Sequence, residues 1–290
     1  MKITSLTHLG RKLPAPLYKL AAQSFIDHKF PRHIFIETTA NCNLSCEYCP
    51  REKRKEDMDF GLFQRIVDEC SHHGPRSFSL HLFGEPLLYP RILDAIRYIK
   101  KANRSNTVLL TTNGTMLNRF AGALSETGVD RIIWSWRKNN FDPRSISLLR
   151  NRGLIRLLIE ETPPEEFEKW SKFPRVEVKH LHNYGGNIDV KKWGIGEPVQ
   201  SEFYPCYHLW LAPAIRWNGD ITICCNDPNG RESFGKYGID FNLGSYWKSN
   251  KLHVIRRTHL NLKPKGICVG CNSYKAYPDI FFEAQKCRAA

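Results

Sequence analysis

The chain has 290 residues, of which 41% are hydrophobic and 25% charged, the composition of a globular protein with one large domain or a domain and a smaller companion. Its formal charge is +14, and the positive charges are scattered. No stretch reaches the roughly 18 apolar residues that a membrane span needs, and the N-terminus lacks a cleavable signal pattern. We expect a cytoplasmic protein with no membrane partner. An anionic partner such as RNA would suit the charge, but a solvated basic surface is the favoured interpretation.

Residues 1–30 are predicted to form an N-terminal helical segment, because their apolar residues have helical spacing. A regular alternation of strands and helices follows. Asp59 is a candidate cap for the first of these helices, and Cys70 lies on its apolar face as a core residue. The expected strands are residues 33–39, 77–84, 107–114, 131–136, 154–160 and 176–182.

Six such alternations predict an α/β fold in which helices cover a parallel sheet, either an open doubly wound sheet or a barrel. In both architectures the loops after the carboxyl ends of the strands carry the chemistry. Here those loops contain the segments CNLSCEYC, GEP, TNGT, SWRKNN and HNYGG. Polar and ligand-forming residues therefore recur at one end of the predicted sheet.

The pattern changes after residue 196. Asn218-Gly219 predicts a tight hairpin between WLAPAIRW and DITICC, and the helical stretch SNKLHVIRRTHL follows. We therefore divide the chain into a helical segment (1–30), a barrel-like domain (31–196) and a small α+β domain (197–290) that is rich in cysteine.

Cys42, Cys46 and Cys49 place three soft ligands within eight positions. In a chain without an export signal, grouped cysteines favour metal or cluster binding over disulfides. Three thiolates suit a catalytic zinc ion with an open position. They suit a 4Fe–4S cluster that is held at three corners at least as well. The spacing alone leaves both open.

Together with GEP at 84–86 and TTNGT at 111–115, this triplet resembles the radical S-adenosylmethionine (radical SAM) superfamily. The resemblance covers roughly residues 31–190 and implies a partial (β/α)6 TIM-like barrel. It also implies that the open iron of the cluster binds S-adenosylmethionine. Reductive cleavage would then give a 5′-deoxyadenosyl radical that abstracts a substrate hydrogen, chemistry that belongs to the cofactor.

The resemblance also implies roles for individual residues. Cys42, Cys46 and Cys49 would bind the SAM-binding 4Fe–4S cluster. The run Trp136-Arg137-Lys138 departs from the many relatives that carry an aspartate shortly after the serine of the fourth strand, which puts an acidic ribose contact in doubt. The residues expected to bind S-adenosylmethionine are Tyr48 near the adenine, Gly84, Glu85 and Pro86 at the methionine amino group, Asn113 after the third strand, Ser135 at the ribose or carboxylate, and Arg156 at the carboxylate.

A second set of cysteines, Cys206, Cys224, Cys268 and Cys271, supplies four thiolates, enough for a tetrahedral zinc site or a closed 4Fe–4S cluster. The pattern resembles the SPASM or twitch extension of radical SAM enzymes. That resemblance implies one auxiliary 4Fe–4S cluster, with no vacancy and thus suited to electron transfer. Cys225 could replace Cys224, but the spacing from Gly219 favours Cys224.

The favoured function is a radical SAM oxidation or dehydrogenation of a sugar or aminocyclitol-type substrate, with the auxiliary cluster as electron relay. Tyr184 is a candidate proton or electron relay. The expected partners are a small-molecule or peptide substrate and an electron donor such as flavodoxin or ferredoxin. The alternatives are a maturase that epimerises or crosslinks a ribosomally made peptide, an RNA-modifying enzyme and, remotely, a metal-containing nucleic-acid-binding module. No segment before residue 31 is long enough for a leader-binding domain.

Overall fold

The computed structural model describes residues 30–136, 183–189, 192, 206 and 208–272, and also the backbone of two strands at 155–159 and 176–178. The predicted N-terminal helical segment and the two helices predicted between residues 137 and 175 lie outside the described residues. So does the domain boundary predicted near residue 196, which remains a prediction.

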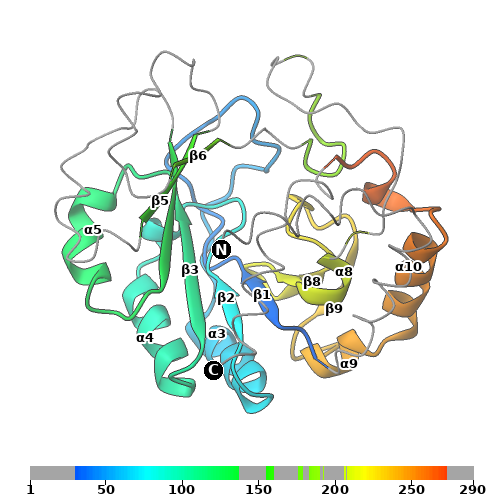
Figure 1. The fold of residues 1–290 in the computed structure, drawn as a ribbon, viewed down its shortest axis with the longest axis horizontal. Helices are drawn as coiled ribbons and strands as arrows, with labels where there is room; N and C mark the ends of the chain where they lie inside the picture. The colour runs from blue at the N-terminus through cyan, green and yellow to red at the C-terminus, as the bar shows by residue number, and fades with distance from the viewer. Residues whose placement is uncertain are drawn as a thin grey trace, which may run out of the picture.

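One sheet of nine strands runs through the described part of the chain, in the order β6-β5-β4-β3-β2-β1-β7-β8-β9 (Figure 1). The first six strands are parallel and lie in chain order, as a partial (β/α)6 barrel requires. They are β1 (His33–Ile36), β2 (Ser77–Ser79), β3 (Thr107–Thr112), β4 (Arg131–Trp136), β5 (Ile155–Ile159) and β6 (Val176–Val178). The predicted fold class is therefore confirmed.

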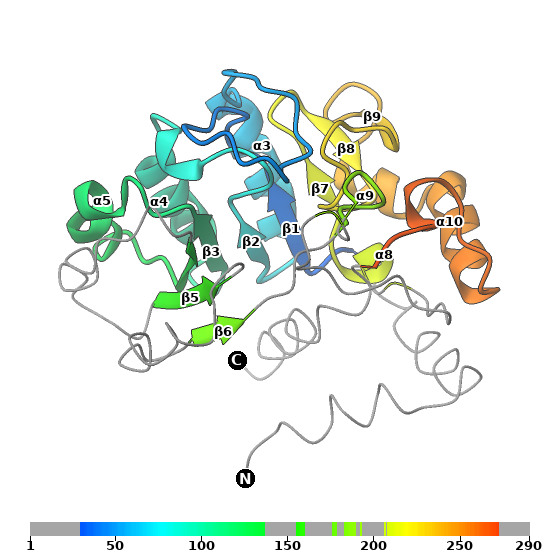
Figure 2. The same cartoon turned by 90° about the horizontal axis from the view of Figure 1, so that it is seen from above.

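The helices after β1, β2 and β3 cover one face of this sheet (Figure 2). The first of them begins at Asp59, whose side chain accepts a hydrogen bond from the backbone N–H of Leu62 at 2.8 Å, so the predicted cap is confirmed. The helices are α3 (Phe60–His72), α4 (Ile92–Ala102) and α5 (Leu117–Leu124), with a short 3₁₀ helix η1 (Pro86–Leu88) before α4.

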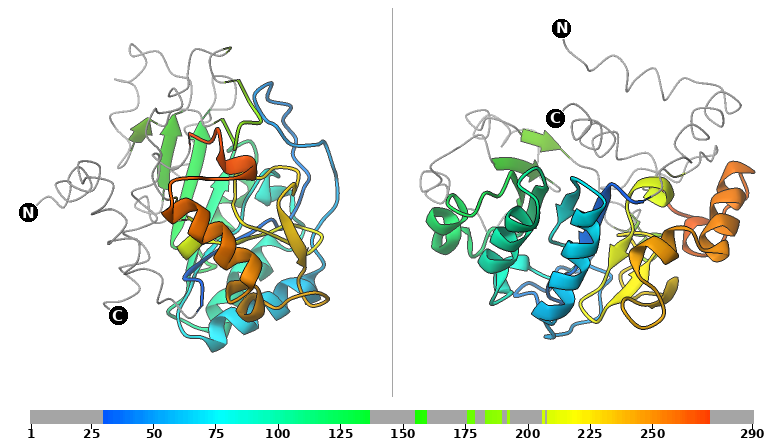
Figure 3. Two further views of the ribbon diagram at one scale, coloured as in Figure 1. Left: turned by 90° about the vertical axis from the view of Figure 1, so that its right-hand side faces the viewer. Right: turned by 90° about the horizontal axis from the view of Figure 1, so that it is seen from below.

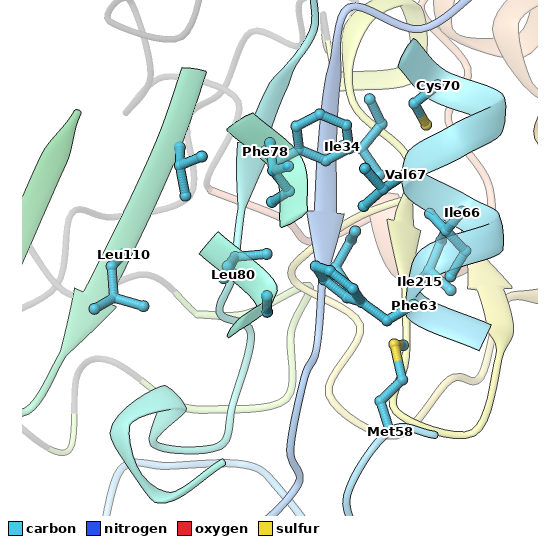
Figure 4. Packing of buried hydrophobic residues seen from close by; sticks show 14 of the residues in the cluster. Ile34, Met58, Phe63, Ile66, Val67, Cys70, Phe78, Leu80, Leu110 and Ile215 are labelled. Atoms are coloured by element: carbon cyan, nitrogen blue, oxygen red, sulfur yellow. The ribbon is translucent and has the colours of Figure 1, made fainter. Parts of the chain in front are cut away.

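Side chains alternate between the two faces of the strands, so each strand gives every second residue to the helical side. Ile34 of β1 and Phe78 of β2 are fully buried there against α3 (Figure 4). Cys70 of α3 belongs to the same core, as predicted. The opposite face is more polar: His33 contacts Ser77 and Ser79 through its two ring nitrogens, at 3.1 and 2.9 Å. This face therefore carries buried polar side chains next to the apolar ring of Phe35.

The C-terminal part of the chain continues the sheet. Strand β7 pairs in parallel with β1, and the hairpin turn at Asn218-Gly219 then leads into antiparallel β8 and β9. Gly219 has φ +86°, which only glycine adopts without strain. The elements are α8 (His208–Leu211), β7 (Ala214–Ile215), β8 (Asp220–Thr222), β9 (Ser233–Lys236), α9 (Leu243–Trp247), α10 (Asn250–Leu260) and the 3₁₀ helix η5 (Gly266–Cys268).

Several expected bounds were wrong in detail: β1 ends at Ile36 and not at residue 39, and β3 ends at Thr112 and not at residue 114. Residues 210–211 belong to helix α8, and only Ala214–Ile215 form the first arm of the hairpin. Pro213 separates the two elements because it cannot continue a helix. Strand β2 ends at Ser79, well before residue 84: Leu80 still donates to the backbone oxygen of Leu109, but the chain then leaves the sheet and turns toward the first cysteine loop.

The view from below shows the helices as an outer arc around the strands (Figure 3, right). No helix among the described residues is long and apolar enough to cross a lipid bilayer.

Candidate functional site

The loop of Cys42, Cys46 and Cys49 follows β1 at the carboxyl end of the parallel strands. All three thiols are partly buried, and a backbone hydrogen bond from Cys49 to Cys46 closes a turn within the loop. Burial raises the pKa of the Cys42 and Cys49 thiols, and the positive charge of Arg51 opposes that rise. Three clustered soft donors, which need a cation to become thiolates, fit the iron of a cluster.

Arg51 organises this loop, and the sequence analysis did not single it out. Its guanidinium donates to the backbone oxygens of Ala40 at 3.4 Å, Cys42 at 3.4 Å and Leu44 at 3.2 Å. A planar group with five donors can bind several carbonyls at once, which a lysine cannot do as well. Its position in the sequence, two residues after Cys49, was the one feature that could have pointed to this role.

The GEP segment packs directly against the cysteine loop. A Cβ on Gly84 would lie 2.0 Å from the backbone oxygen of Thr39, so only glycine fits there. The next residue, Glu85, donates its backbone N–H to the oxygen of Asn41 at 2.7 Å. Pro86 begins the 3₁₀ helix η1 and is buried. The segment therefore lies where the predicted contacts with S-adenosylmethionine would be made, and those contacts remain predictions.

The Glu85 carboxylate, 2% exposed, ties this segment to the end of β3. One oxygen accepts from the hydroxyl of Thr112 at 2.7 Å and from the N–H of Leu87 at 3.1 Å, and the other accepts from the N–H of Asn113 at 2.7 Å. Burial raises its pKa, while these hydrogen bonds lower it. Glu85 thus fixes the GEP loop against the loop that follows β3.

Asn113 continues this connection to the first cysteine set. Its side-chain amide donates to Oδ1 of Asn43 at 3.0 Å and approaches Sγ of Cys42 at 3.9 Å. The turn that follows needs Gly114, which has φ +81° and whose Cβ would lie 1.9 Å from Nε1 of Trp134. Asn113 thus both forms a turn and contacts the cysteine loop.

The remaining residues of the first predicted site are less closely determined. Tyr48 lies in the cysteine loop and is buried. Ser135 is half-buried in β4, on the face opposite Trp134, which is fully buried in the helical core. Arg156 lies in β5 beside Ile133 of β4, but its side chain is outside the described part of the structure.

A buried ion pair joins the end of β1 to the end of β7. Nε of Arg216 lies 3.5 Å from Oε2 of Glu37, which is 1% exposed. Burial raises the pKa of Glu37, and Arg216 opposes that rise. Neither residue was singled out in the sequence, because the partners lie 179 positions apart.

The second cysteine set lines one cavity. Cys206, Cys224, Cys268 and Cys271 all contribute to its wall, along with apolar residues and two buried histidines. Cys225 is not among the lining residues; it packs instead against the cluster of Phe35, Leu211, Ala212 and Ala214.

These four thiols are buried together around one cavity. Burial raises the pKa of Cys206 and Cys268, and the neighbouring thiols raise it further. Four such donors fit either a tetrahedral zinc site or a closed 4Fe–4S cluster, so the second cluster remains a prediction.

The loop after β6 forms part of this cavity and also reaches toward GEP. Asn183 and Asn272 exchange hydrogen bonds, and Gly185 lines the cavity. Tyr184, between Asn183 and Gly185 in the chain, has φ +44°, which is rare for a non-glycine residue. Its ring centroid lies 5.7 Å from that of Phe83, the residue before Gly84. Tyr184 is therefore placed between the two cysteine sets.

A second link joins the same two regions. The side chain of Asn229, in the loop after β8, accepts from the N–H of Glu52 at 3.3 Å and donates to the oxygen of Pro50 at 3.5 Å. The C-terminal cysteine region is thus attached to the residues that follow Cys49.

Residues 36–135 match the family model of the radical SAM superfamily. The chain is 34% identical over 110 residues to a tungsten-containing aldehyde ferredoxin oxidoreductase cofactor-modifying protein of Pyrococcus furiosus, covering 36% of this chain and 30% of that protein. It is 33% identical over 185 residues to a probable GTP 3′,8-cyclase of Methanococcus maripaludis, covering 62% and 50%. The chain thus spans about a third to a half of the length of these curated relatives.

Solved structures share the fold. BtrN in complex with AdoMet and 2-DOIA superposes with a TM-score of 0.66 at 19% identity, covering 83% of this chain and 93% of that one. Streptococcus suis SuiB bound to precursor peptide SuiA gives a TM-score of 0.60 at 17% identity, covering 90% and 74%. The matched residues, 36–135, contain the three-cysteine loop, GEP and the end of β3, so this region of the chain is a radical SAM domain.

Proposed function

We propose that this protein is an S-adenosylmethionine-dependent radical enzyme that oxidises a sugar or aminocyclitol-type substrate, with a second 4Fe–4S cluster as electron relay. The observation that carries the proposal is the pair of thiol sets. Three thiols lie at the carboxyl end of β1, four line a cavity, and Asn229 joins the two regions.

The superfamily uses a 4Fe–4S cluster and S-adenosylmethionine; when bound, the cluster would supply one electron and S-adenosylmethionine would accept it at its sulfonium, which provides the radical chemistry. In this chain Cys42, Cys46 and Cys49 would hold that cluster. Arg51 fixes the carbonyls of their loop, and Glu85 fixes the GEP segment that would meet the methionine end of the cofactor.

The substrate would enter at the carboxyl ends of the strands. The inner face there presents the ring of Tyr184 and, deeper, the hydrogen-bonded pair His81 and Thr111, whose Nε2 and Oγ1 lie 3.2 Å apart. Polar side chains of this kind suit hydroxyl or amine groups of a substrate. Tyr184 would position the substrate between the two cysteine sets.

Oxidation is favoured because the second set offers four protein ligands. Loss of a hydrogen atom leaves one electron and one proton to be removed from the substrate, and a fully ligated cluster can accept an electron without binding substrate. The choice of a sugar or aminocyclitol-type substrate rests on the C-terminal cysteine module, whose short length and four thiolates resemble those of relatives that oxidise sugar alcohols. BtrN and SuiB share this fold, and their structures are complexes with 2-DOIA and with a precursor peptide respectively, so a peptide maturase is the second candidate.

The first experiment is anaerobic reconstitution followed by iron and zinc analysis and an assay for 5′-deoxyadenosine with dithionite. About eight irons per chain and no zinc are expected for two 4Fe–4S clusters. Cys46→Ala should abolish 5′-deoxyadenosine. Cys271→Ala should keep reductive cleavage and lose the second cluster.

Cys225→Ala is the matched control, because this thiol is adjacent to Cys224 but does not line the cavity. It should retain both clusters. Substrates deuterated at their carbinol positions then test the reaction: transfer of deuterium into 5′-deoxyadenosine from an aminocyclitol supports the proposal, and transfer only from a peptide favours the maturase. Zinc with four irons would contradict the second cluster.

A further inference from the structure

A long basic segment contains two of the four cysteines of the second set, Cys268 and Cys271. Residues 243–272 contain six lysines and arginines and no aspartate or glutamate, although the whole chain has 29 acidic residues. In a chain where positive and negative charges are otherwise mixed, such a segment produces a positive surface wherever its side chains reach solvent.

The structure exposes five of these six cations. Helix α10 buries Arg256, whose guanidinium donates to the backbone oxygens of Leu209 and Trp247, and turns its other cations outward. The exposed cations are Lys248, Lys251, Arg257, Lys263 and Lys265. We call the exposed surface of residues 248–272 the α10 face. It includes α10 and η5, which lie on the same side of the molecule (Figure 3, left).

Exposed apolar side chains lie within the same segment. Of the four large hydrophobic residues that are exposed in the described part of the chain, three are here: Val254 at 56%, Leu262 at 42% and Val269 at 62%. Apolar residues among cations are typical of protein-binding surfaces, in which a central apolar contact is surrounded by steering charges.

The C-terminal end of the α10 face borders the second cysteine set. Val269 and Gly270 are exposed, and the residues on either side of them, Cys268 and Cys271, line the cavity. A protein bound at Val269 would therefore have only the short segment 268–271 between its surface and these thiols.

Glu232 places one negative charge beside this face, against five exposed cations, so the face stays positive. Oε1 of Glu232 accepts from the backbone N–H of Ile267 at 3.4 Å, at the start of η5, and the side chain is half-buried. Its neighbour Arg231 is exposed and restores the positive charge. Asp227 is buried and accepts the N–H groups of Arg231 and Glu232.

We propose that the α10 face is the docking surface for an acidic one-electron carrier protein of the flavin or iron–sulfur type, which reaches the second cysteine set at Val269. This rests on the proposed second cluster. The reduced carrier is oxidised by one electron at the second cysteine set. That electron would pass on to the first set, where it is needed for cleavage of S-adenosylmethionine, so that the second set is oxidised again and can take the electron from the substrate.

Two observations favour a redox protein over RNA. The exposed side chains between the cations are aliphatic, whereas single-stranded nucleic acid is held by aromatic residues that stack on its bases. The surface also borders a set of thiols, a position with a use in electron transfer and none in RNA binding.

The test uses the reconstituted protein and measures binding of a recombinant acidic flavodoxin and, in a separate arm, an acidic ferredoxin. The variant is the triple charge reversal Arg257→Glu, Lys263→Glu and Lys265→Glu. Its matched control reverses three exposed cations on the α4–α5 side of the molecule, Lys101→Glu, Arg104→Glu and Arg119→Glu (Figure 1).

We expect at least one carrier to bind, and raising NaCl from about 0.05 M to about 0.5 M to weaken its Kd about tenfold or more. The α10-face variant should lose a similar factor at low salt, while the control variant should stay within about twofold of the unchanged protein. Iron content and circular dichroism verify that both variants fold. In the variant, carrier-driven formation of 5′-deoxyadenosine should fall and dithionite-driven formation should not.

The proposal is overturned if neither carrier binds or if the two variants weaken binding equally. It is also overturned if a short single-stranded RNA displaces the carrier and binds this face more tightly. Absence of dithionite-driven 5′-deoxyadenosine would instead contradict the proposed function, and the binding arms would still decide the docking surface.

Discussion

Asn183 and Asn272 hold each other through reciprocal hydrogen bonds: the backbone N–H of each donates to the side-chain oxygen of the other, at 2.9 and 3.2 Å. Both residues are buried, and the Asn183 amide also donates to the oxygen of Gly270 at 2.5 Å. The pair attaches the loop after β6 to the CxxC segment, so the wall of the cysteine cavity depends on two residues 89 positions apart.

Asn183→Ala should therefore destabilise the protein by about 1–3 kcal/mol, because the buried N–H of Asn272 and the backbone oxygen of Gly270 both lose this partner. It should also lower the iron content of the second site while leaving the first site loaded. Asn118→Ala, at an exposed position on α5, is the control and should change neither quantity. Equal iron loss from both sites would contradict a local role.

Arg51→Ala should release three carbonyls of the first cysteine loop. We expect slower cluster assembly and faster loss of iron to a chelator, because the thiols then lose their fixed positions. Arg51→Lys should restore only part of the effect, since a lysine cannot reproduce the fork. The control is Arg54→Ala, which removes an exposed ion pair with Glu52 and should have little effect.

Gly114→Ala should be among the most destabilising single substitutions. Its Cβ would overlap the buried indole of Trp134, and φ +81° is strained for alanine. A loss of about 2 kcal/mol or more in the free energy of unfolding is expected. Gly122→Ala, where nothing lies within 4 Å, should be neutral or stabilising because α5 is helical there. Similar urea midpoints for the two variants would contradict this account.

Tyr184→Phe separates two roles of this side chain. If the ring positions substrate through its contact with Phe83, the variant should keep most product formation, whereas a relay through the hydroxyl would be lost. We expect the ring to matter most. Tyr184→Gly should stabilise the backbone at φ +44° yet lower the ratio of product to 5′-deoxyadenosine. Product formation in Tyr184→Gly equal to that of the unchanged protein would exclude the positioning role.

His33 makes stability depend on pH. Burial, and then the nearby His81 and His208, lower its pKa to about 3, so the folded state holds it neutral. Because the unfolded state takes up a proton below about pH 6.5, this stability is present above that pH and is lost as the pH falls toward 3.

Between pH 7 and pH 5 this one group should cost about 2 kcal/mol of unfolding free energy. His33→Gln should therefore reduce the difference between the two urea titrations by about that amount. His253→Gln, at an exposed position on α10, is the control. An unchanged difference in His33→Gln would show that another group causes the acid sensitivity.

The sequence by itself determined the alternation of elements, since period-two and helical patterns report directly on which faces are buried. It predicted the parallel order of β1–β6, the Asp59 cap, the Asn218-Gly219 turn and the core position of Cys70. It also predicted the two cysteine sets, because ligand spacing is local along the chain.

Only the tertiary structure decided how these parts meet. The pairing of β7 with β1, the ion pair of Glu37 and Arg216, and the exchange between Asn183 and Asn272 join residues far apart in the chain, and no local pattern encodes such partners. The role of Arg51 is hidden for another reason: it binds backbone carbonyls, which are the same in every sequence. The face that borders the second cysteine set likewise required the structure, because exposure depends on packing between elements.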